Sequence, residues 1–404
     1  MDVSSAPGLA TITRDGKKID VVVQTTKTGL IFVLDRETGE PVFPIEEKKV
    51  ATEEAAQGEK LNATQPIPVL PKAFSRQTLT KDDLNNLVDS ASYQDIRDRF
   101  SSLRYEGMFT PPTEKGTLIF PGYDGGGEWG GGAFDPNTEM FYVNANEMAW
   151  VLNLVKERKE KKVVKTNLEA GKILYSNHCM RCHGPDLQGG GDYPGITEVK
   201  SKYTLPGFIE LVTTGRRMMP GFSHLTNQEK NAIASFVLNI SSEQKKSYKG
   251  DMNKLTDDSV VNYTFTGYNK FLTKEGYPAI SPPWGTLTAV DLSTGLHKWQ
   301  IPFGEYEEFK SKGISATGRE NYGGPVVTAG GVIFIGATDD AKFRAFNAKD
   351  GKVLYETDLP ATGFATPSVY SVNGRQYVVI AAGGSKWGGK KSDAYVAFAL
   401  PVGK

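Results

Sequence analysis

The apolar residues follow two different patterns along the chain. Short apolar runs that end in Gly, Asp or Thr lie towards both ends and predict β-strands. The clearest are residues 19–23, 30–34, 118–120 and 141–143. In the middle of the chain, apolar residues recur instead at helical spacing. They are Ala170, Ile173 and Leu174, followed later by Ile233, Phe236, Val237 and Ile240. A helical unit is therefore expected between two β-rich regions.

Capping boxes mark where two of the central helices begin. Thr166-Asn-Leu-Glu169 precedes the first apolar series, and Thr226-Asn-Gln-Glu229 precedes the second. Polar segments at 156–162 and 241–258 flank this unit and are predicted to be linkers. Because β sequence continues on both sides, the unit is expected to be inserted at a surface loop. Residues 41–112 are rich in Pro and polar residues. This composition predicts a long segment without regular secondary structure, apart from one short helix after Thr80.

A short pattern repeats within the β regions. Ala289-Val-Asp291-Leu-Ser-Thr294-Gly295 has a counterpart in Ala345-Phe-Asn347-Ala-Lys-Asp350-Gly351. Val33-Leu-Asp35-Arg-Glu-Thr38-Gly39 matches the same template, and the segment from Ala133 to Thr138 matches it weakly. Each copy reads as strand, Asx-type turn and strand. Four copies favour a β-propeller. The alternative is a set of independent hairpins in another all-β fold.

Composition narrows the class of protein. A chain of 404 residues predicts two or three domains, and 44 Gly with 17 Tyr are typical of a turn-rich β protein. Lys plus Arg equals Asp plus Glu at 47 each, so no basic stripe indicates nucleic acid as a partner. No apolar run is long enough to predict a membrane-spanning segment.

The strongest chemical motif is Cys179-Met180-Arg181-Cys182-His183. Two thiols at this spacing can form thioethers to haem while the adjacent imidazole binds the iron. The alternatives are a disulfide, a redox dithiol and half of a zinc site. Zinc would need more ligands, yet the chain has no other Cys and three other His. The motif therefore predicts covalent haem c with Cys179 and Cys182 as attachment points and His183 as iron ligand.

A second iron ligand is expected downstream, in Gly215-Arg216-Arg217-Met218-Met219-Pro220-Gly221. A thioether opposite an imidazole suits electron transfer. Met219 is the preferred ligand because Pro220 fixes the backbone after it, and Met218 is expected to pack in a small core. Residues 166–241 resemble a class I cytochrome c domain.

The repeat ending in Trp299 resembles the tryptophan docking motif of pyrroloquinoline quinone (PQQ) dehydrogenases. Further segments resemble the membrane glucose dehydrogenase type of that family. They are Thr26–Gly29, Phe32–Arg36, Arg104–Pro112, Glu128–Gly131, Gly323–Pro325 and Gln376–Ile380. The resemblance implies part of an eight-bladed PQQ propeller, in residues 1–155 and 259–404, with an inserted all-α cytochrome c domain.

The resemblance also implies individual roles. Lys27 corresponds to a lysine that contacts the PQQ carbonyls, and Asn144 to an asparagine beside the cofactor. Glu128 and Trp129 resemble part of the pocket wall, while Trp299 is structural, wedged between blades. His224 and His297 belong to no motif and are expected at the surface.

The family's catalytic base, an aspartate, and its calcium ligands correspond to positions upstream of Met1. The chain is therefore expected to be the carboxy-terminal part of a longer periplasmic enzyme, inactive by itself. That enzyme would oxidise a sugar, polyol or alcohol by hydride transfer to PQQ, with electrons passing through haem to a cytochrome or quinone acceptor. The alternative is a non-catalytic propeller scaffold that carries an electron-transfer cytochrome.

Overall fold

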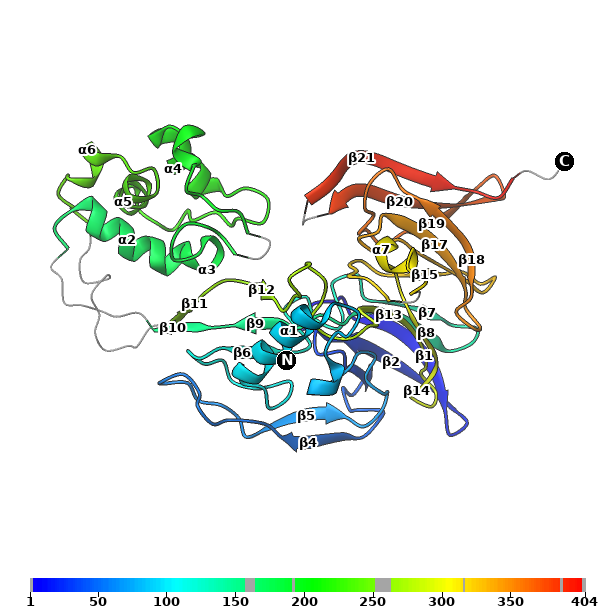
Figure 1. Ribbon diagram of the computed structural model, residues 1–404. Coiled ribbons are helices and arrows are strands. Elements are labelled where there is room, and N and C mark those ends of the chain that lie inside the picture. The colour runs from blue at the N-terminus through cyan, green and yellow to red at the C-terminus, as the bar shows by residue number, and fades with distance from the viewer. Residues whose placement is uncertain are drawn as a thin grey trace.

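The computed structural model describes residues 3–156, 164–190, 193–250, 263–314, 317–385 and 388–401. In these ranges, five antiparallel sheets of three or four strands form an open arc (Figure 1). Two of the sheets have three strands each: β1 (Gly8–Arg14), β2 (Lys17–Thr25) and β3 (Ile31–Asp35), then β6 (Thr117–Ile119), β9 (Trp150–Leu152) and β12 (Asn269–Lys270). The next two have four strands each: β7 (Gly132–Asp135), β8 (Met140–Asn146), β13 (Gly285–Asp291) and β14 (Leu296–Pro302), then β15 (Val326–Val327), β16 (Val332–Ile335), β17 (Lys342–Asn347) and β18 (Val353–Asp358). The fifth contains β19 (Ser368–Val372), β20 (Arg375–Ser385) and β21 (Gly388–Phe398).

The predicted strand–turn–strand repeat is confirmed at its polar residue. The Oδ1 atom of Asp35 accepts hydrogen bonds from two backbone N–H groups of its turn, both at 2.9 Å. Asp291 accepts two such bonds in the β13–β14 turn. Asn347 accepts one in the β17–β18 turn, and so does Asp135 between β7 and β8. The side chain at this position holds each turn closed.

Trp299 joins two neighbouring sheets, as expected. Its Nε1 donates to the carbonyl oxygen of Ala348, in the turn of the next sheet, at 3.0 Å. Gly351 lies under the indole, and a Cβ there would come within 3.1 Å of the ring. Tyr142 packs on the Trp299 ring with 5.9 Å between ring centroids. The tryptophan therefore acts as a wedge between blades.

Residues 41–112 are more regular than expected. The helix after Thr80 exists as a single 3₁₀ turn, Lys81–Asp83, with the capping box of Thr80 and Asp83 formed. The larger helix α1 (Ser90–Ser102) was not predicted, and it is capped by Asp89. A hairpin of β4 (Ile45–Lys49) and β5 (Thr64–Pro68) was also missed. The prediction of irregular structure is wrong for these segments.

The helical module is connected to the sheets by a short ribbon. β10 (Leu154–Lys156) pairs antiparallel with β11 (Tyr263–Phe265), so the chain leaves and returns side by side. Between them lie α2 (Asn167–His178), α3 (Met180–His183), the 3₁₀ turn Val199–Ser201, α4 (Leu205–Thr214), α5 (Asn227–Val237) and α6 (Ser241–Gln244). A short α7 (Glu307–Lys310) belongs to the sheet region. Both predicted capping boxes are formed, at Thr166 and Thr226.

The predicted linkers are only partly described. Residues 157–162 and 251–258 lie outside the described ranges. The first part of the second linker folds against the module, because α6 begins at Ser241 and Tyr248 is 7% exposed in the module's core.

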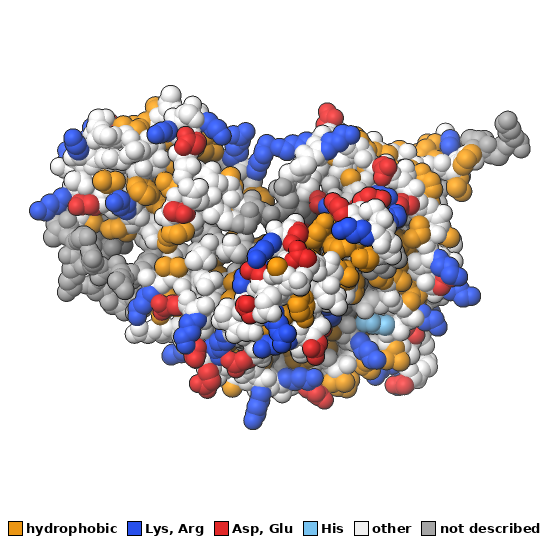
Figure 2. Space-filling view, viewed as in Figure 1, with side chains coloured by type: hydrophobic (Ala, Val, Ile, Leu, Met, Phe, Trp, Pro, Cys, Tyr) orange, Lys and Arg blue, Asp and Glu red, His pale blue; other side chains and the backbone are white. Residues whose placement is uncertain are grey.

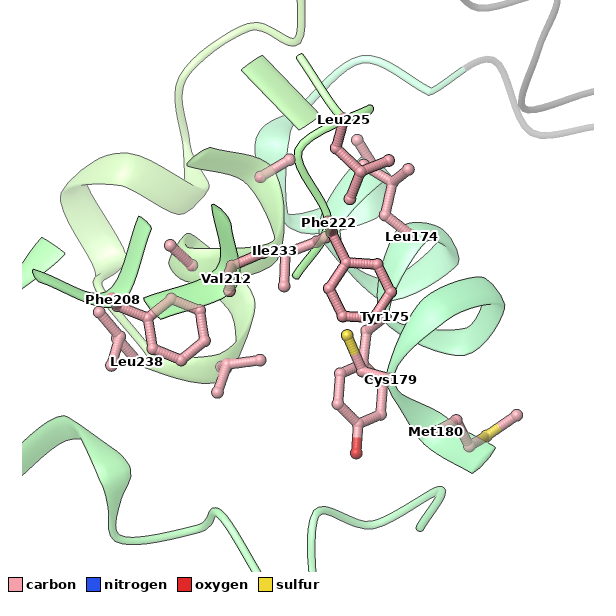
Figure 3. Close-up of a cluster of buried hydrophobic side chains, with 14 of the residues drawn as sticks. Leu174, Tyr175, Cys179, Met180, Phe208, Val212, Phe222, Leu225, Ile233 and Leu238 are labelled. Atoms are coloured by element: carbon pink, nitrogen blue, oxygen red, sulfur yellow. The ribbon is translucent and has the colours of Figure 1, made fainter. Parts of the chain in front are cut away.

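The core of the module forms where α2 crosses α5 (Figure 3). Gly171 allows this approach, since a Cβ there would lie 2.1 Å from the carbonyl oxygen of Ala232. Phe222 and Tyr175 lie beside the Cys179 sulfur, and Leu174 lies near Leu225 in the same core (Figure 3).

Figure 2 shows Lys and Arg interspersed with Asp and Glu over the visible face. Among the described helices, none combines the length and apolar character that a membrane crossing requires.

Candidate functional site

Cys179 and Cys182 lie at the junction of α2 and α3, and both are free thiols. Cys179 is 9% exposed. Burial, followed by the neighbouring Cys182, raises the pKa of Cys179 to about 12. Burial also raises the pKa of Cys182. A redox dithiol works through a thiolate with a lowered pKa, so this environment disfavours that alternative.

His183 is oriented by a backbone carbonyl. Its Nδ1 lies 2.9 Å from the carbonyl oxygen of Pro194. A carbonyl oxygen can only accept, so Nδ1 carries a proton, and in the neutral ring the lone pair is then on Nε2. An imidazole held in this way is the usual form of a metal-binding histidine. The two thiols and this imidazole make up a donor set that fits haem c.

The methionine loop separates Met218 from Met219. Arg216 and Met219 exchange backbone hydrogen bonds at 2.9 and 3.0 Å, and Arg217 between them has a φ of 57°. This tight turn leaves Met218 51% exposed, while Met219 packs against the module's core. The prediction that Met218 packs in a core is therefore wrong, because the turn directs it to solvent. Met219 is partly buried against this core, and its role as an iron ligand remains a prediction.

A second site is built around the glycine-rich loop of residues 122–132. A Cβ on Gly125 would lie 2.8 Å from Cγ of Lys27, and a Cβ on Gly126 would lie 2.8 Å from Cα of Gly29. The backbone N–H of Gly126 donates to the carbonyl oxygen of Lys27 at 2.6 Å. Only glycine allows two backbone segments to approach this closely.

The loop places Lys27 next to the end of β8. The Nζ of Lys27 donates to the carbonyl oxygen of Tyr123 at 3.0 Å. On the other side of the loop, the N–H of Asn146 donates to the carbonyl oxygen of Gly126 at 2.9 Å. Lys27 and the strand that carries Asn144 therefore meet at one loop, although they are far apart in sequence.

Asn144 is 4% exposed, and among the described residues its side chain is hydrogen-bonded through the amide nitrogen but not through the amide oxygen. Its Nδ2 donates to Oδ1 of Asn321 at 2.6 Å and to the carbonyl oxygen of Gly323 at 3.2 Å. Its Oδ1 is buried without a hydrogen-bond partner among the described residues. A buried acceptor without a partner is costly unless a ligand supplies a donor. Together with the Lys27 ammonium, it provides a donor and an acceptor that fit a quinone bearing polar substituents.

Glu128 and Trp129 belong to the same loop but differ in burial. Trp129 is 52% exposed, whereas Glu128 is half-buried. Burial, and then the carboxylates of Asp124, Glu320 and Glu128, raise the pKa of Tyr322. Glu128 therefore lies, like Asp124 and Glu320, in the surroundings of Tyr322.

The structure adds residues that the sequence pattern did not reveal. Trp150 is 3% exposed, and the Nζ of Lys270 lies 5.7 Å from its ring centroid. Lys270 also forms an ion pair with Oε1 of Glu320 at 2.9 Å. Asn321 hydrogen-bonds both Asn144 and Asn146. The polar run immediately before Gly323-Gly-Pro325 was the available signal for Glu320 and Asn321.

His224 and His297 differ in exposure. His224 is exposed, as expected. His297 is half-buried, with Nε2 3.2 Å from the carbonyl oxygen of Lys72, so the surface prediction is only partly right for it.

The sheet region and the helical module each match a known protein family. Residues 1–181 and 211–378 match the β-propeller domain of glucose/ethanol/alcohol dehydrogenases of the PQQ type. Residues 166–237 match the model described as cytochrome c oxidase, cbb3-type, subunit III.

Similar individual proteins are dehydrogenases. Quinoprotein glucose dehydrogenase of Escherichia coli K12 is 33% identical over 410 residues, which cover 99% of this chain and 41% of that protein. Quinate/shikimate dehydrogenase (quinone) of Acinetobacter baylyi is 29% identical, over 96% of this chain and 39% of that protein. The solved quinohemoprotein alcohol dehydrogenase of Comamonas testosteroni aligns with a TM-score of 0.44 at 18% identity, over 98% of this chain and 38% of that one.

The chain spans about two fifths of the length of these curated relatives. The propeller match covers well over half of the chain and includes the predicted repeat and the glycine loop. This chain therefore belongs to the PQQ family of glucose/ethanol/alcohol dehydrogenase β-propellers, and it carries a cytochrome c domain.

Proposed function

We propose that the complete protein is a periplasmic quinohaemoprotein dehydrogenase that oxidises a sugar, polyol or alcohol. PQQ, when bound, accepts the hydride equivalent of the substrate. Electrons then leave through the haem-bearing module to an external cytochrome or quinone. Calcium belongs to the proposal through the family resemblance. Attachment of haem to the Cys179–His183 motif after export is the reason to propose the periplasm.

One observation supports the proposal most strongly. The glycine loop is packed directly on Lys27 and is hydrogen-bonded to β8, which carries Asn144. Lys27 can donate a hydrogen bond to a quinone carbonyl, and its positive charge would stabilise the negative charge that develops on that oxygen during reduction. The buried Oδ1 of Asn144 can accept from the cofactor. Glu128 and Trp129 complete the proposed pocket wall.

In the haem module, the chain's own residues would hold the iron and set its chemistry. Cys179 and Cys182 would attach the porphyrin, and His183 and Met219 would bind the iron. With an imidazole and a thioether as its protein ligands, the iron would carry electrons rather than activate oxygen. The carbonyl of Pro194 keeps the His183 ring in the tautomer that can bind iron.

The test is binding of PQQ to the complete protein, in wild type and in Lys27→Ala. Loss of a charge-assisted hydrogen bond is expected to weaken binding by about ten- to a hundredfold. Lys18→Ala, at an exposed position on β2, is the matched control and should bind as wild type. A panel of sugars and alcohols with a reducible dye then tests turnover. Absence of PQQ binding in wild type would leave the scaffold alternative.

A further inference from the structure

A group of aromatic rings fills the contact between the haem module and the propeller. Tyr268 lies between β11 and β12, on the segment that returns from the module. In the part of the chain that the structure describes, four rings surround it, with centroids between 4.8 and 6.4 Å away. These rings are Tyr123, Trp150, Tyr193 and Phe265. Three of the contacts are edge-to-face, which is a favourable arrangement of aromatic pairs.

One end of this group lies at the candidate quinone pocket. Tyr123 packs edge-on against Tyr268 at 4.8 Å and against Trp150 at 5.6 Å. The carbonyl oxygen of the same Tyr123 accepts the hydrogen bond from Nζ of Lys27. Burial, and then the neighbouring Tyr268, raise the pKa of Tyr123, so its hydroxyl stays neutral within the packed contact.

The other end lies at the haem-binding motif. Tyr193 belongs to the module and packs on Tyr268 with 5.4 Å between centroids and an interplanar angle of 31°. The next residue is Pro194, whose carbonyl oxygen contacts Nδ1 of His183. The residue that docks on the propeller and the residue that orients the expected iron ligand are therefore neighbours in sequence.

Backbone contacts support the same docking. α3 contacts β11, and Figure 1 shows α3 close to the β11–β12 segment. A Cβ on Gly267 would lie 3.2 Å from the carbonyl oxygen of Arg181, within the Cys179–His183 motif. A Cβ on Gly190 would lie 3.3 Å from Oδ1 of Asn269. The segment around Tyr268 is thus in close contact with the residues on both sides of His183.

We propose that Tyr268 is a positioning residue that docks the haem module on the propeller, through Tyr193 on one side and Tyr123 with Trp150 on the other. The rings lie in the contact between the candidate quinone pocket, at Tyr123, and the haem-binding motif, next to Tyr193. This inference rests on the proposed function. Oxidation of one alcohol to a carbonyl yields two electrons and two protons. The electrons would pass one at a time to the haem that the module holds, and an external one-electron acceptor would take up each of them in turn. The protons pass to water.

Two measurements on the complete protein, loaded with PQQ and haem, test the proposal. The first is hydrogen exchange of the backbone amides in residues 187–196. The second compares the rate of haem reduction after substrate addition with the rate of reduction of a dye that takes electrons directly from the quinone pocket. The variants are Tyr268→Ala, Tyr268→Phe and Tyr193→Ala. Tyr370→Ala, which removes an exposed ring from a tyrosine pair on β19 and β20, is the matched control.

Tyr268→Ala is expected to speed amide exchange and slow haem reduction, each by about tenfold, because four ring contacts are lost. Dye reduction should stay within about twofold of wild type, since the substrate pocket is unchanged. Tyr268→Phe keeps the rings in contact and should restore both values. Tyr193→Ala should act in the same direction, which keeps the proposal testable if Tyr268→Ala does not fold.

The proposal is overturned if exchange and haem reduction in both alanine variants match those of Tyr370→Ala. It is also overturned if dye and haem reduction fall together, because Tyr268 would then act on substrate oxidation. If the wild-type protein reduces neither dye nor haem, the proposed function fails. The exchange measurement still decides the docking role in that case.

Discussion

Gly125 and Lys27 are packed so closely that any side chain on the glycine would collide with the lysine. A Cβ on Gly125 would come within 2.8 Å of Cγ and 2.9 Å of Cα of Lys27. Gly125 also has a φ of 70°, which disfavours other residues. The glycine loop thus holds Lys27, the cation that is expected to contact the quinone.

Gly125→Ala should therefore weaken PQQ binding by about tenfold or more, because Lys27 must move to make room. Gly39→Ala is the matched control. Gly39 has a similar φ of 76°, but no atom lies within 4 Å of its added Cβ. Titration of both variants with PQQ separates the effect of crowding Lys27 from the effect of placing an alanine at a positive φ. Equal affinities in the two variants would show that the contact with Lys27 is unimportant for the pocket.

The two methionines of the Met loop should behave differently. Met219→Ala should lower the haem midpoint potential and change the haem spectrum, because a thioether ligand opposite histidine raises the potential. Met218→Ala should leave both unchanged, since Met218 is 51% exposed. Redox titration of the haem in the two variants is the measurement. A shift caused by Met218→Ala alone would reverse the assignment.

Removal of the Trp299 wedge should destabilise the propeller. Trp299→Ala loses the contact with Tyr142 and the hydrogen bond to Ala348, and the free energy of unfolding should fall by about 3 kcal/mol. Lys298→Ala, at the exposed neighbouring position on β14, should change it by less than about 0.5 kcal/mol. Denaturant unfolding measures both. Similar losses in the two variants would contradict the wedge.

A buried ion pair predicts acid sensitivity. Nη2 of Arg344 lies 2.6 Å from Oδ2 of Asp340, and the two side chains are 4% and 7% exposed. Burial acts to raise the pKa of Asp340, but the charge and hydrogen bonds of Arg344 outweigh it and hold the pKa below its usual value. The stabilisation is complete above the unfolded pKa of about 3.9, and it is lost as pH falls through the lower folded pKa.

Asp340→Asn should lower the free energy of unfolding at pH 7 by about 3 kcal/mol. It should also reduce the loss of stability that wild type shows below about pH 4. Asp358→Asn, at an exposed position on β18, is the control. Unfolding curves at several pH values measure both effects. An unchanged acid response in Asp340→Asn would exclude Asp340 as its source.

Features encoded by neighbouring residues were predictable from the sequence. The Asx turns at Asp35, Asp291 and Asn347 and the capping boxes at Thr166 and Thr226 depend on hydrogen bonds within a few residues. Each of these side chains forms hydrogen bonds with backbone groups a few residues away wherever the pattern occurs. The residue pattern alone is therefore enough to predict the turn or the helix cap.

Features that depend on distant contacts were not predictable. Helix α1 buries little apolar surface, because Ile96 is its fully buried apolar residue. The helical spacing of apolar residues was therefore too weak to predict this helix. The outward turn of Met218 follows from the positive φ of Arg217. The contact between Tyr193 and Tyr268 joins the module to the sheets across polar segments, and no spacing rule connects the two rings. The partners of Asn144 likewise come from a different strand-end segment.

We propose that one chain combines a quinone pocket, in which Lys27 contacts the cofactor, with a haem module that receives the electrons. The most direct test follows the haem absorbance of the complete protein, loaded with PQQ and calcium, after substrate is added without an external acceptor. The substrate is one that the dye assay has shown to be oxidised. The account predicts rapid haem reduction in wild type and much slower reduction in Lys27→Ala. Haem that stays oxidised in wild type, while the same preparation reduces the dye, would contradict it.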